Sequence, residues 1–420
     1  MRSIDELDVR GQRVLVRVDF NVPLGEGPDG RRMVTDDTRI RAALPTIEEL
    51  RARGARLVLA SHLGRPKGKV VPELSLEPVV STLCQLTGAP VSLAPAVVGP
   101  AVRELTEQLA EGEILVLENV RFEPGETAND PELAHALAEL ADLYVDDAFG
   151  TAHRAHASTE GVAHLLPAAA GRLLEKEVKT LTGVLDHPAP PLIAILGGAK
   201  VADKIAVIDR FLGLADALLI GGAMCFPFLA AQGHAVGASL CEDEDVDHAR
   251  HALARAADCA PRGDGLAADR RTALPDDGTK ATRLCLPKDL VIGESFAEDA
   301  PNRILSSVEV PSGWMGLDIG PATCELYARE IAAAGSVFWN GPMGAFELTP
   351  FAAGTQAVAK AVAEAPGLTV VGGGDSAAAL VQFGLEDAVD YLSTGGGATL
   401  ELVEGRVLPG LRALDGAGVA

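Results

Sequence analysis

The sequence predicts an α/β protein with parallel sheets and more than one domain. Short apolar runs of strand length alternate with helical patterns, as expected for strands joined by crossover helices. The length of 420 residues is typical of two or three domains. A helical stretch from Gly171 to Asp186 is followed by His187-Pro-Ala-Pro-Pro191, whose prolines break regular structure. We therefore place a domain boundary at this segment.

Composition limits the classes of function. A formal net charge of −23 at pH 7 argues against a nucleic-acid partner and against binding to an anionic membrane surface. The six cysteines are scattered without a Cys-x-x-Cys pair, which favours reduced thiols over a disulfide framework or a zinc site. The N-terminus lacks an apolar signal region, and the most apolar run, residues 217–231, is shorter than a spanning helix. We expect a soluble, cytoplasmic protein.

Charged and polar side chains follow each predicted strand of the N-terminal half. The strands are expected at residues 13–18, 55–60, 114–117 and 143–145. The candidate ligand-binding residues that follow them are Asp19, Asn21, His62, Arg65, Arg121 and Arg154. Because the carboxyl ends of parallel strands meet at one edge of a sheet, we expect these side chains to gather there. A basic patch on an acidic protein suits a small, multiply charged anion.

These residues also have simpler interpretations. Asp19 and Asn21 can form an Asx turn that closes a strand before Pro23. Any single arginine of the group can be a solvated surface residue. His153 and His156 are spaced as metal ligands can be, but no third ligand cluster accompanies them. Arg39 lies in the first turn of a predicted helix, where a cation gains little from the helix dipole, and this favours a ligand role.

The stretch from Pro191 to Lys204 predicts a strand, a glycine turn and a helix. Gly197 and Gly198 end the apolar run, and a helical pattern follows. Lys200 and Lys204 lie four residues apart, so we expect both to project from one face over the helix N-terminus. This is a candidate phosphate site without a P-loop motif. The alternative is an ordinary turn with two solvated lysines.

Further glycine turns follow strands in the C-terminal half. Residues 368–374 predict a strand that runs into three glycines, after which Asp375 and Ser376 open a helix. An acid beside a phosphate cradle needs a cation, so Asp375 is a candidate Mg²⁺ ligand; otherwise it is a helix N-cap. Residues 393–398 repeat the pattern and can meet a phosphoryl group. Glu347 is a candidate for a ribose hydroxyl or a solvated acid. Residues 256–282 lack periodicity and predict an exposed loop.

Long motifs across nearly the whole chain resemble phosphoglycerate kinase. In the N-terminal half they are Arg17-Val-Asp-Phe-Asn-Val-Pro23, Ser61-His-Leu-Gly-Arg-Pro66, Leu117-Glu-Asn-Val-Arg-Phe122 and Asp147-Ala-Phe-Gly-Thr-Ala-His-Arg-Ala-His156. In the C-terminal half they are Leu196-Gly-Gly-Ala-Lys-Val-Ala-Asp-Lys204, Leu317-Asp-Ile-Gly-Pro321, Trp339-Asn-Gly-Pro342, Gly372-Gly-Gly-Asp375 and Ser393-Thr-Gly-Gly-Gly397. So many motifs in one order are far more specific than a single glycine fingerprint.

The resemblance implies two doubly wound, Rossmann-like α/β domains joined by a hinge. Residues 1–172 would bind phosphoglycerate, residues 173–190 would form the hinge helix and linker, and residues 191–404 would bind the nucleotide. The tail, residues 405–420, would pack back onto the first domain. The implied reaction is reversible phosphoryl transfer from 1,3-bisphosphoglycerate to MgADP, giving 3-phosphoglycerate and MgATP, by a monomer.

The resemblance also implies roles for individual residues. The glycerate would be held by Asp19, Asn21, Arg39, His62, Arg65, Arg121 and Arg154. The nucleotide would be held by Lys204, Gly316, Glu347, Gly373, Gly374, Asp375 and Ser376, with Asp375 serving Mg²⁺. The group in transit would be stabilised by Arg39, Lys200, Lys204 and N–H groups near Gly373 and Gly396.

The sequence departs from the family pattern at four places. Residues 256–282 are longer than expected, and Ile292-Gly-Glu-Ser-Phe296 stands where Ala-Asp-Lys-Phe is usual. Pro227 and Ser376 each replace a usual threonine. Two alternatives follow: a kinase for a related phosphorylated carboxylic acid, or a non-catalytic homologue that keeps the phosphate and nucleotide sites.

Overall fold

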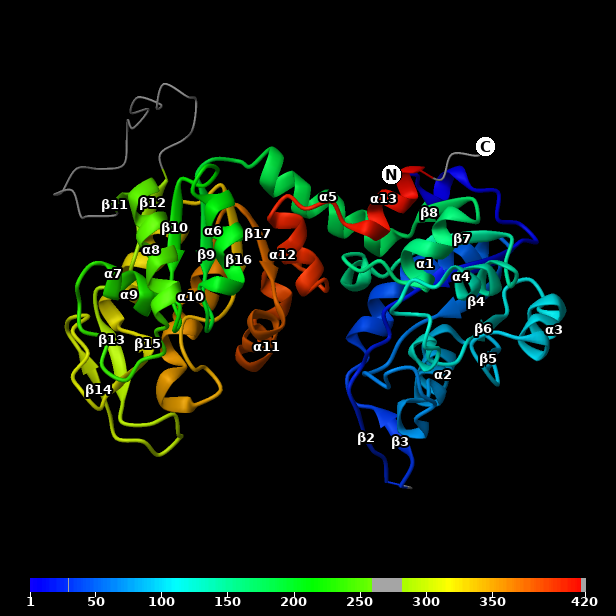
Figure 1. The fold of residues 1–420 in the computed structure, drawn as a ribbon, viewed down its shortest axis with the longest axis horizontal. Helices are drawn as coiled ribbons and strands as arrows, with labels where there is room; N and C mark the ends of the chain where they lie inside the picture. The colour runs from blue at the N-terminus through cyan, green and yellow to red at the C-terminus, as the bar shows by residue number, and fades with distance from the viewer. Residues whose placement is uncertain (29, 259–281, 417–420) are drawn as a thin grey trace. The chain divides into compact units, whose positions relative to one another are not determined.

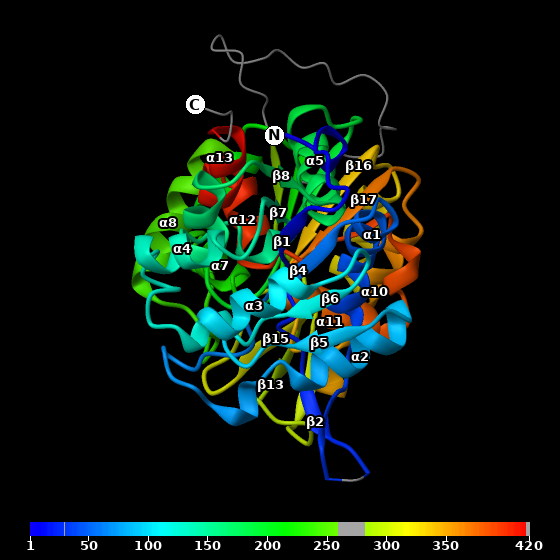
Figure 2. The same cartoon turned by 90° about the vertical axis from the view of Figure 1, so that its right-hand side faces the viewer.

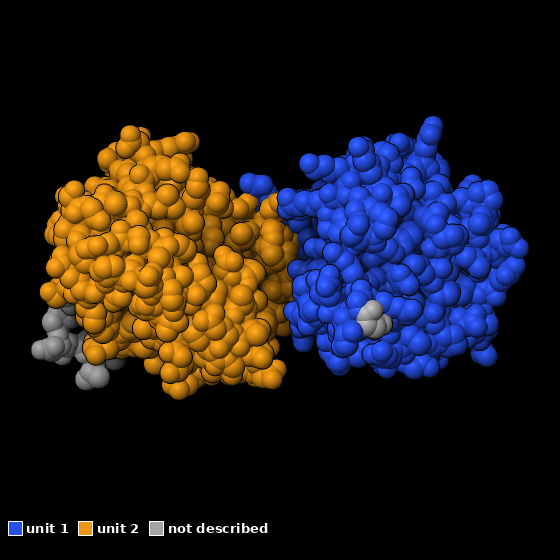
Figure 3. Space-filling view, turned by 90° about the horizontal axis from the view of Figure 1, so that it is seen from below, with its two compact units in different colours: residues 1–179, 406–420 blue, residues 180–405 orange. Residues whose placement is uncertain are grey.

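The computed structural model describes residues 1–28, 30–258 and 282–416 (Figure 1). The chain divides into two compact units, Met1–Lys179 with Arg406–Ala420, and Thr180–Gly405 (Figure 3). The division falls within helix α5 (Arg172–Asp186), inside the segment expected to be the hinge. Most of the loop predicted at residues 256–282 lies outside the described residues. None of the helices in the described ranges combines the length and apolar character needed to cross a bilayer.

The first unit is built on a six-stranded parallel sheet, in the order β5-β6-β4-β1-β7-β8. Its strands are β1 (Arg13–Arg17), β4 (Arg56–Ala60), β5 (Val91–Leu93), β6 (Ile114–Val116), β7 (Leu143–Asp146) and β8 (Ala168–Ala170). The helices are α1 (Thr38–Ala52), α2 (Glu77–Thr87), α3 (Pro100–Gln108), α4 (Pro131–Ala138) and α13 (Pro409–Gly416). A separate hairpin pairs β2 (Leu24–Glu26) with β3 (Arg32–Val34).

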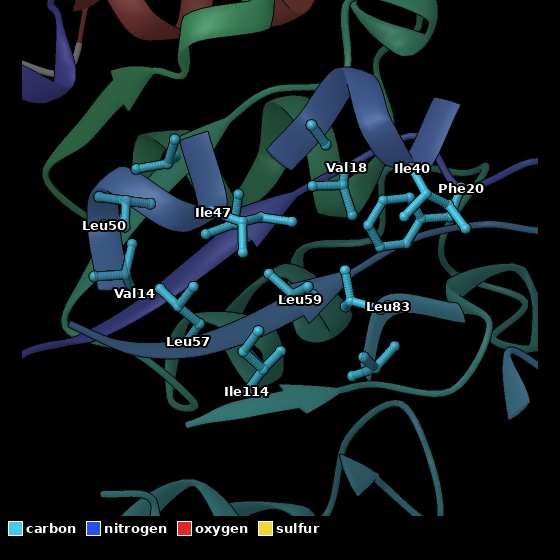
Figure 4. Packing of buried hydrophobic residues seen from close by; sticks show 14 of the residues in the cluster. Val14, Val18, Phe20, Ile40, Ile47, Leu50, Leu57, Leu59, Leu83 and Ile114 are labelled. Carbon is cyan, nitrogen blue, oxygen red and sulfur yellow. The ribbon is translucent and has the colours of Figure 1, made fainter. Parts of the chain in front are cut away.

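Helices cover both faces of this sheet. Figure 2 shows α1 and α2 on one side of the strands and α3 and α4 on the other. The core against α1 and α2 is made of branched aliphatic side chains from alternate strand positions, with Val14 and Leu57 facing Ile47 and Leu50 (Figure 4). Because successive strand residues point to opposite faces, Leu15 and its neighbours fill the other face. The expected parallel α/β architecture is confirmed.

The second unit has a seven-stranded parallel sheet, in the order β11-β12-β10-β9-β16-β17-β18. Its strands are β9 (Leu192–Leu196), β10 (Ala217–Ile220), β11 (Ala257–Asp258), β12 (Arg283–Cys285), β16 (Ser336–Asn340), β17 (Leu368–Gly372) and β18 (Tyr391–Leu392). Its helices, in addition to the later part of α5, are α6 (Ile205–Phe211), α7 (Cys225–Ala231), α8 (Asp243–Arg255), α9 (Pro321–Ile331), α10 (Ala353–Ala363), α11 (Gly374–Phe383) and α12 (Gly397–Val403).

A three-stranded antiparallel sheet adds to the second unit. It is formed by β14 (Asn302–Leu305), β13 (Leu290–Gly293) and β15 (Met315–Ile319), in that order. The apolar stretch at residues 284–292 does not form one continuous strand. It divides into β12 and β13, which lie in different sheets, because Pro287 and the residues beside it interrupt the apolar run.

The cysteines differ in state. Cys84, Cys225, Cys241 and Cys324 are free thiols, as expected. Cys285, at the buried end of β12, is disulfide-bonded, so the expectation of a fully reduced set is wrong for that residue.

Candidate active site

The ends of four neighbouring strands, β6, β4, β1 and β7, bring most of the predicted polar residues of the first unit together. The last residue of β1, Arg17, is in register with Ala60 at the end of β4 and with Asp146 at the end of β7. The chain continues from these ends into loops that carry Asp19, His62 and Arg154, and β6, which pairs with β4, is followed by Arg121. Because these strand ends are in register, the side chains that follow them lie at the same edge of the sheet, as the sequence predicts.

A cavity of about 570 Å³ lies among these loops. Arg65, Arg121 and Arg154 of the predicted set line it, together with Lys67, Gly68, Glu123, Pro124 and Thr127. Lys67 and Thr127 were not predicted from the sequence. The sequence does contain a clue to Lys67, because it lies two residues after Arg65 in the same loop. Its backbone is left-handed, with φ 58°, and so is that of Gly68, with φ 73°. A Cβ on Gly68 would lie 2.9 Å from Pro124 Cα, so the turn needs glycine to reach the cavity wall.

The charges around the cavity favour the binding of an anion. Arg121 is only 8% exposed. Burial, followed by the repulsion of Arg154 and Arg17, lowers the pKa of its guanidinium to about 10. One of its nitrogens, Nη1, donates to Gly64 O at 2.7 Å, while Nε has no partner in the described part of the chain. An anionic group in the cavity would relieve both the repulsion and the unpaired donor.

The remaining four predicted residues do not line the cavity but are joined to it. Arg39, in the first turn of α1, pairs with Asp19. Burial acts to raise the pKa of Asp19, but the neighbouring cations, including Arg39 and Arg17, outweigh it, so the pKa lies below its ordinary value. Asn21 accepts the N–H of Gly64 at 2.9 Å, so its amide N–H groups remain as donors. Gly64 thus links Asn21 to Arg121, whose bond to Gly64 O is described above.

In the second unit, Lys204 is the better placed of the two predicted lysines. Its Nζ donates to Gly197 O at 2.6 Å and to Asn340 O at 3.1 Å. Burial lowers the pKa of its ammonium group to about 8, although the charges of Asp375 and Asp203 act in the opposite direction. Two carbonyl contacts leave one ammonium proton for a ligand.

Lys200 behaves differently, and the expectation that both lysines share one helical face is wrong. Residues 202–204 form the short helix η7 (Ala202–Lys204), and α6 begins only at Ile205. Lys200 precedes both, is 45% exposed, and pairs with Glu242 at 2.9 Å. This partner raises the pKa of the Lys200 ammonium group. The glycine turn is followed by an irregular segment, so the spacing of four does not place the two side chains together.

The glycine turn after β17 forms a second candidate site. Gly373, with φ 93°, is the residue before α11, and a Cβ there would lie 2.8 Å from Asn340 Nδ2. Asn340 is buried, and its Nδ2 has no partner in the residues that the structure describes. A buried amide donor next to the glycine turn is a candidate phosphate contact that the sequence analysis missed. Asp375 is exposed in the first turn of α11.

The other predicted nucleotide-binding residues differ in their exposure to solvent. The Ser376 hydroxyl is buried and accepts the N–H of Gly341 at 2.6 Å, so its oxygen already holds the loop after β16. Gly396 precedes α12, with φ 52°. Glu347 is exposed. Gly316 is buried in β15, and a Cβ there would lie 2.2 Å from Phe226 Cζ, so glycine is required for the packing of that ring.

Packing explains the glycine at position 293, within the segment 292–296 that departs from the family pattern. A Cβ on Gly293 would lie 2.9 Å from both Leu317 Cδ1 and Phe351 Cζ. Gly293 ends β13, where these two side chains close over it. Nothing in the structure explains Pro227, which is buried in α7.

Metal ligation by side chains alone is not supported. Within the described ranges, no group of three or more His, Cys, Asp or Glu residues could hold a metal ion. The pair His153 and His156 does not form a zinc site there. Instead, Arg154 Nε donates to His153 Nε2 at 3.1 Å, so His153 supports an arginine of the cavity.

The phosphoglycerate kinase family model matches residues 4–406. The chain belongs to the phosphoglycerate kinase family. It is 54% identical over 413 residues to phosphoglycerate kinase of Rubrobacter xylanophilus, covering 98% of each chain. It is 51% identical over 418 residues to that of Roseiflexus castenholzii, covering 99% of each.

Solved structures agree with this family assignment. The structure of phosphoglycerate kinase from Coxiella burnetii matches with a TM-score of 0.83 and 39% identity over 98% of each chain. The one from Pyrococcus horikoshii matches with a TM-score of 0.78 and 30% identity, over 99% of this chain and 98% of that one. The two-domain α/β fold and the phosphoglycerate kinase function expected from the motifs are confirmed.

Proposed function

We propose that the chain transfers a phosphoryl group reversibly between 1,3-bisphosphoglycerate and ADP, with the acid held by the first unit and the nucleotide by the second. The observation that carries the assignment of the acid site is the arginine-lined cavity of the first unit. Three guanidinium groups and Lys67 face one space there. On a chain of net charge −23, such a concentration of cations needs an anionic ligand to explain it.

The two ends of the acid would meet different groups. We assign its phosphate to Arg65, Arg121 and Arg154, because planar guanidinium groups bind phosphate oxygens in pairs. We assign its carboxyl and hydroxyl end to Asp19, Asn21, Arg39 and His62. Asp19 can accept from the hydroxyl, while Asn21 and Arg39 can donate to carboxyl oxygens. Gly64 supports this division, because it bonds to both Asn21 and Arg121.

The nucleotide is assigned to the glycine turns of the second unit. The N–H groups of Gly373, Gly374, Asp375 and Ser376 would meet its phosphates, together with Lys204 and the amide of Asn340. Gly316 and Glu347 are assigned to the nucleoside. The single exposed carboxylate of Asp375 fits a Mg²⁺ ion that takes most of its ligands from nucleotide phosphates and water. That ion would neutralise phosphate charge when bound.

The transfer itself needs positioning and charge stabilisation. An oxygen of the ADP terminal phosphate attacks the acyl phosphate, the bond from phosphorus to the carboxyl oxygen breaks, and the carboxylate leaves without a proton transfer. Lys204 would stabilise the phosphoryl oxygens, with Arg39, Lys200 and the N–H groups at Gly373 and Gly396 as further donors. Burial strengthens the Lys204 contribution, because charges interact more strongly where water is excluded.

The remaining assignments concern localisation, partners and the domains, and they rest on composition and on the resemblance. A monomer in the cytoplasm, without a nucleic-acid or membrane partner, agrees with the strongly acidic composition. Residues 405–420 would complete the phosphoglycerate-binding domain, residues 1–172, and residues 191–404 would form the nucleotide-binding domain.

A coupled assay of ATP formation from 1,3-bisphosphoglycerate and MgADP tests the proposal. We expect turnover that falls at least 100-fold in Arg121→Ala, with thermal stability largely kept. The matched control is Arg103→Ala, because Arg103 pairs with Glu139 on the surface of the same unit. Absence of turnover by pure, folded wild-type protein that still binds both substrates would identify a non-catalytic homologue. Faster turnover with another phosphorylated acid would identify a related kinase.

A further inference from the structure

A chain of buried polar groups lies beneath the acid site of the first unit. Arg17, Glu126 and Ser158 are 0% exposed, and His62 is 5% exposed. Among these four, only His62 was assigned to the substrate. A charged arginine held away from solvent at the end of β1 is unusual, and it needs a physical explanation.

Two hydrogen bonds fix the guanidinium group of Arg17 from below the site. Glu126 accepts both the N–H of Ser158, at 3.0 Å, and its hydroxyl, at 2.7 Å. Because the Ser158 proton is given to Glu126, the Ser158 oxygen is the acceptor for Arg17 Nε, at 2.8 Å. Arg17 Nη1 donates to the carbonyl of Val18. The guanidinium plane is therefore set by groups that are not assigned to the substrate.

The remaining nitrogen of Arg17 meets the histidine ring. Arg17 Nη2 lies 3.3 Å from His62 Nδ1. A guanidinium group has only donors, so Nδ1 must be the acceptor and carry no proton. A neutral imidazole has one proton, and it then lies on Nε2. Within the described residues, the polar contacts of this ring all involve Nδ1, so Nε2–H is available to donate.

The charges around the ring agree with a neutral state. Burial is the main factor that lowers the pKa of His62 well below its ordinary value, and Arg17, Arg121 and Arg39 act in the same direction. Asp19 acts against them, with Oδ1 3.8 Å from His62 Nδ1. Three cations and one carboxylate face the ring, so the neutral form prevails.

We propose that Arg17 is a positioning residue that holds His62 in the neutral Nε2–H tautomer, so that His62 donates a hydrogen bond to the bound acid, and that Glu126 and Ser158 hold Arg17 for this purpose. The inference rests on the proposed function, because it takes His62 to contact the acid. Arg17 itself acts through His62. If Arg17 had only a structural role, replacing it would not change the tautomer of His62.

Nitrogen NMR of the histidine side chains measures this directly. Protein labelled with ¹⁵N at histidine is examined by long-range ¹H–¹⁵N correlation at pH 7, and the His62 signals are assigned with His62→Gln. We expect a protonated Nε2 and an unprotonated Nδ1 in the wild type. In Arg17→Met, we expect both tautomers to appear, and 3-phosphoglycerate, measured by calorimetry, to bind about tenfold more weakly.

Two further variants keep the test decisive. Arg13→Met is the matched control, because Arg13 lies on the same strand and pairs with Asp142 at 2.7 Å. It should change neither the His62 spectrum nor the affinity. Where Arg17→Met does not fold, Ser158→Ala removes the acceptor of Arg17 Nε and should shift the same His62 signals.

Several results would overturn the proposal. A proton on His62 Nδ1 in the wild type would contradict the hydrogen-bond directions. An unchanged tautomer in a folded Arg17→Met or Ser158→Ala protein would remove the positioning role. Unchanged 3-phosphoglycerate affinity in His62→Gln, with the expected tautomer in the wild type, would instead show that His62 does not contact the acid, while the arginine-lined cavity would stand.

Discussion

At the scale of single residues, hydrogen-bond partners separate two lysines that look alike in the sequence. Lys204 is held by the carbonyls of Gly197 and Asn340, and burial lowers its pKa to about 8. Lys200 is exposed and already paired with Glu242. A cation with a spare proton in a partly buried place can stabilise a phosphate far more than one that is solvated and neutralised.

This difference gives a prediction for the two lysines. Lys204→Ala should lower kcat by about 100-fold or more. The change in melting temperature should be small, because the cost of burying the ammonium group, seen in its lowered pKa, offsets its two hydrogen bonds to carbonyls. Lys200→Ala is the matched variant and should lower kcat only a few-fold. Coupled-assay kinetics and calorimetry on the same samples make the comparison. Equal loss of activity and stability in Lys204→Ala would indicate a structural lysine.

Lys67 gives a second prediction, in which stability and binding change in opposite directions. Its left-handed backbone, with φ 58°, is unfavourable for a residue with a side chain, by roughly 1–2 kcal/mol. Lys67→Gly should therefore raise the free energy of unfolding by about 0.5–1 kcal/mol. It should also weaken 3-phosphoglycerate binding a few-fold, more so at low salt, because the cavity loses a cation.

Lys69 provides the control for that experiment. It lies two residues further on, is exposed, and is not among the residues that line the cavity. Lys69→Gly should leave both the affinity and its dependence on salt unchanged. Lys67→Gly with wild-type affinity would show that this lysine is not part of the acid site.

At the scale of elements, the strands were predictable and the buried connections were not. Apolar runs located β1, β4, β9 and β17, and glycines marked the ends of the last two. Parallel pairing then brought the polar strand ends together. The late start of α6 was missed, because the segment from Gly198 to Lys204 takes its shape from contacts with the loop after β16. Arg17, Glu126 and Ser158 were missed for a similar reason, since their partners are distant in sequence.

A buried carboxyl group at the start of α5 makes the free energy of unfolding depend on pH. Asp147 Oδ1 accepts the N–H groups of Leu173 and Leu174, at 2.9 and 3.2 Å, in the first turn of the helix. Burial is the main factor that raises the pKa of Asp147 to about 8. An unfolded aspartate has a pKa near 3.9. The folded protein therefore binds more protons between these values, and the free energy of unfolding falls as pH rises from about 4 to 8.

Replacing the Asp147 carboxyl group by an amide should remove this fall in the free energy of unfolding with rising pH. Asp147→Asn keeps an oxygen for the two N–H groups but cannot ionise. Between pH 5 and pH 8, we expect the variant to lose on the order of 2 kcal/mol less stability than the wild type. Urea unfolding at several pH values measures this difference. Asp146, whose burial raises its pKa to about 6, acts similarly in both proteins. Parallel curves for the two proteins would show that Asp147 does not ionise in this range.

At the scale of the whole molecule, the end of the chain belongs to the unit that contains its beginning. Helix α13 packs against β8 and against the short helices η5 (Ala157–Gly161) and η6 (Val162–His164) of the first unit. Leu408, Ala413 and Leu414 are at most 2% exposed. The N–H of Gly410 donates to Ala152 O at 2.9 Å, on the loop that leads to Arg154. The last helix thus supports the loop that supplies an arginine to the acid cavity.

Leu414→Ala should therefore weaken the first unit specifically. Truncating a buried leucine lowers the free energy of unfolding by about 2–5 kcal/mol. Calorimetry should show a lower transition for the first unit, and 3-phosphoglycerate should raise it again, because a ligand stabilises the state that binds it. The matched variant Val403→Ala removes a buried aliphatic side chain from the second unit and should spare that transition. If Leu414→Ala shifted only a transition that responds to nucleotide, α13 would have to be assigned to the stability of the second unit.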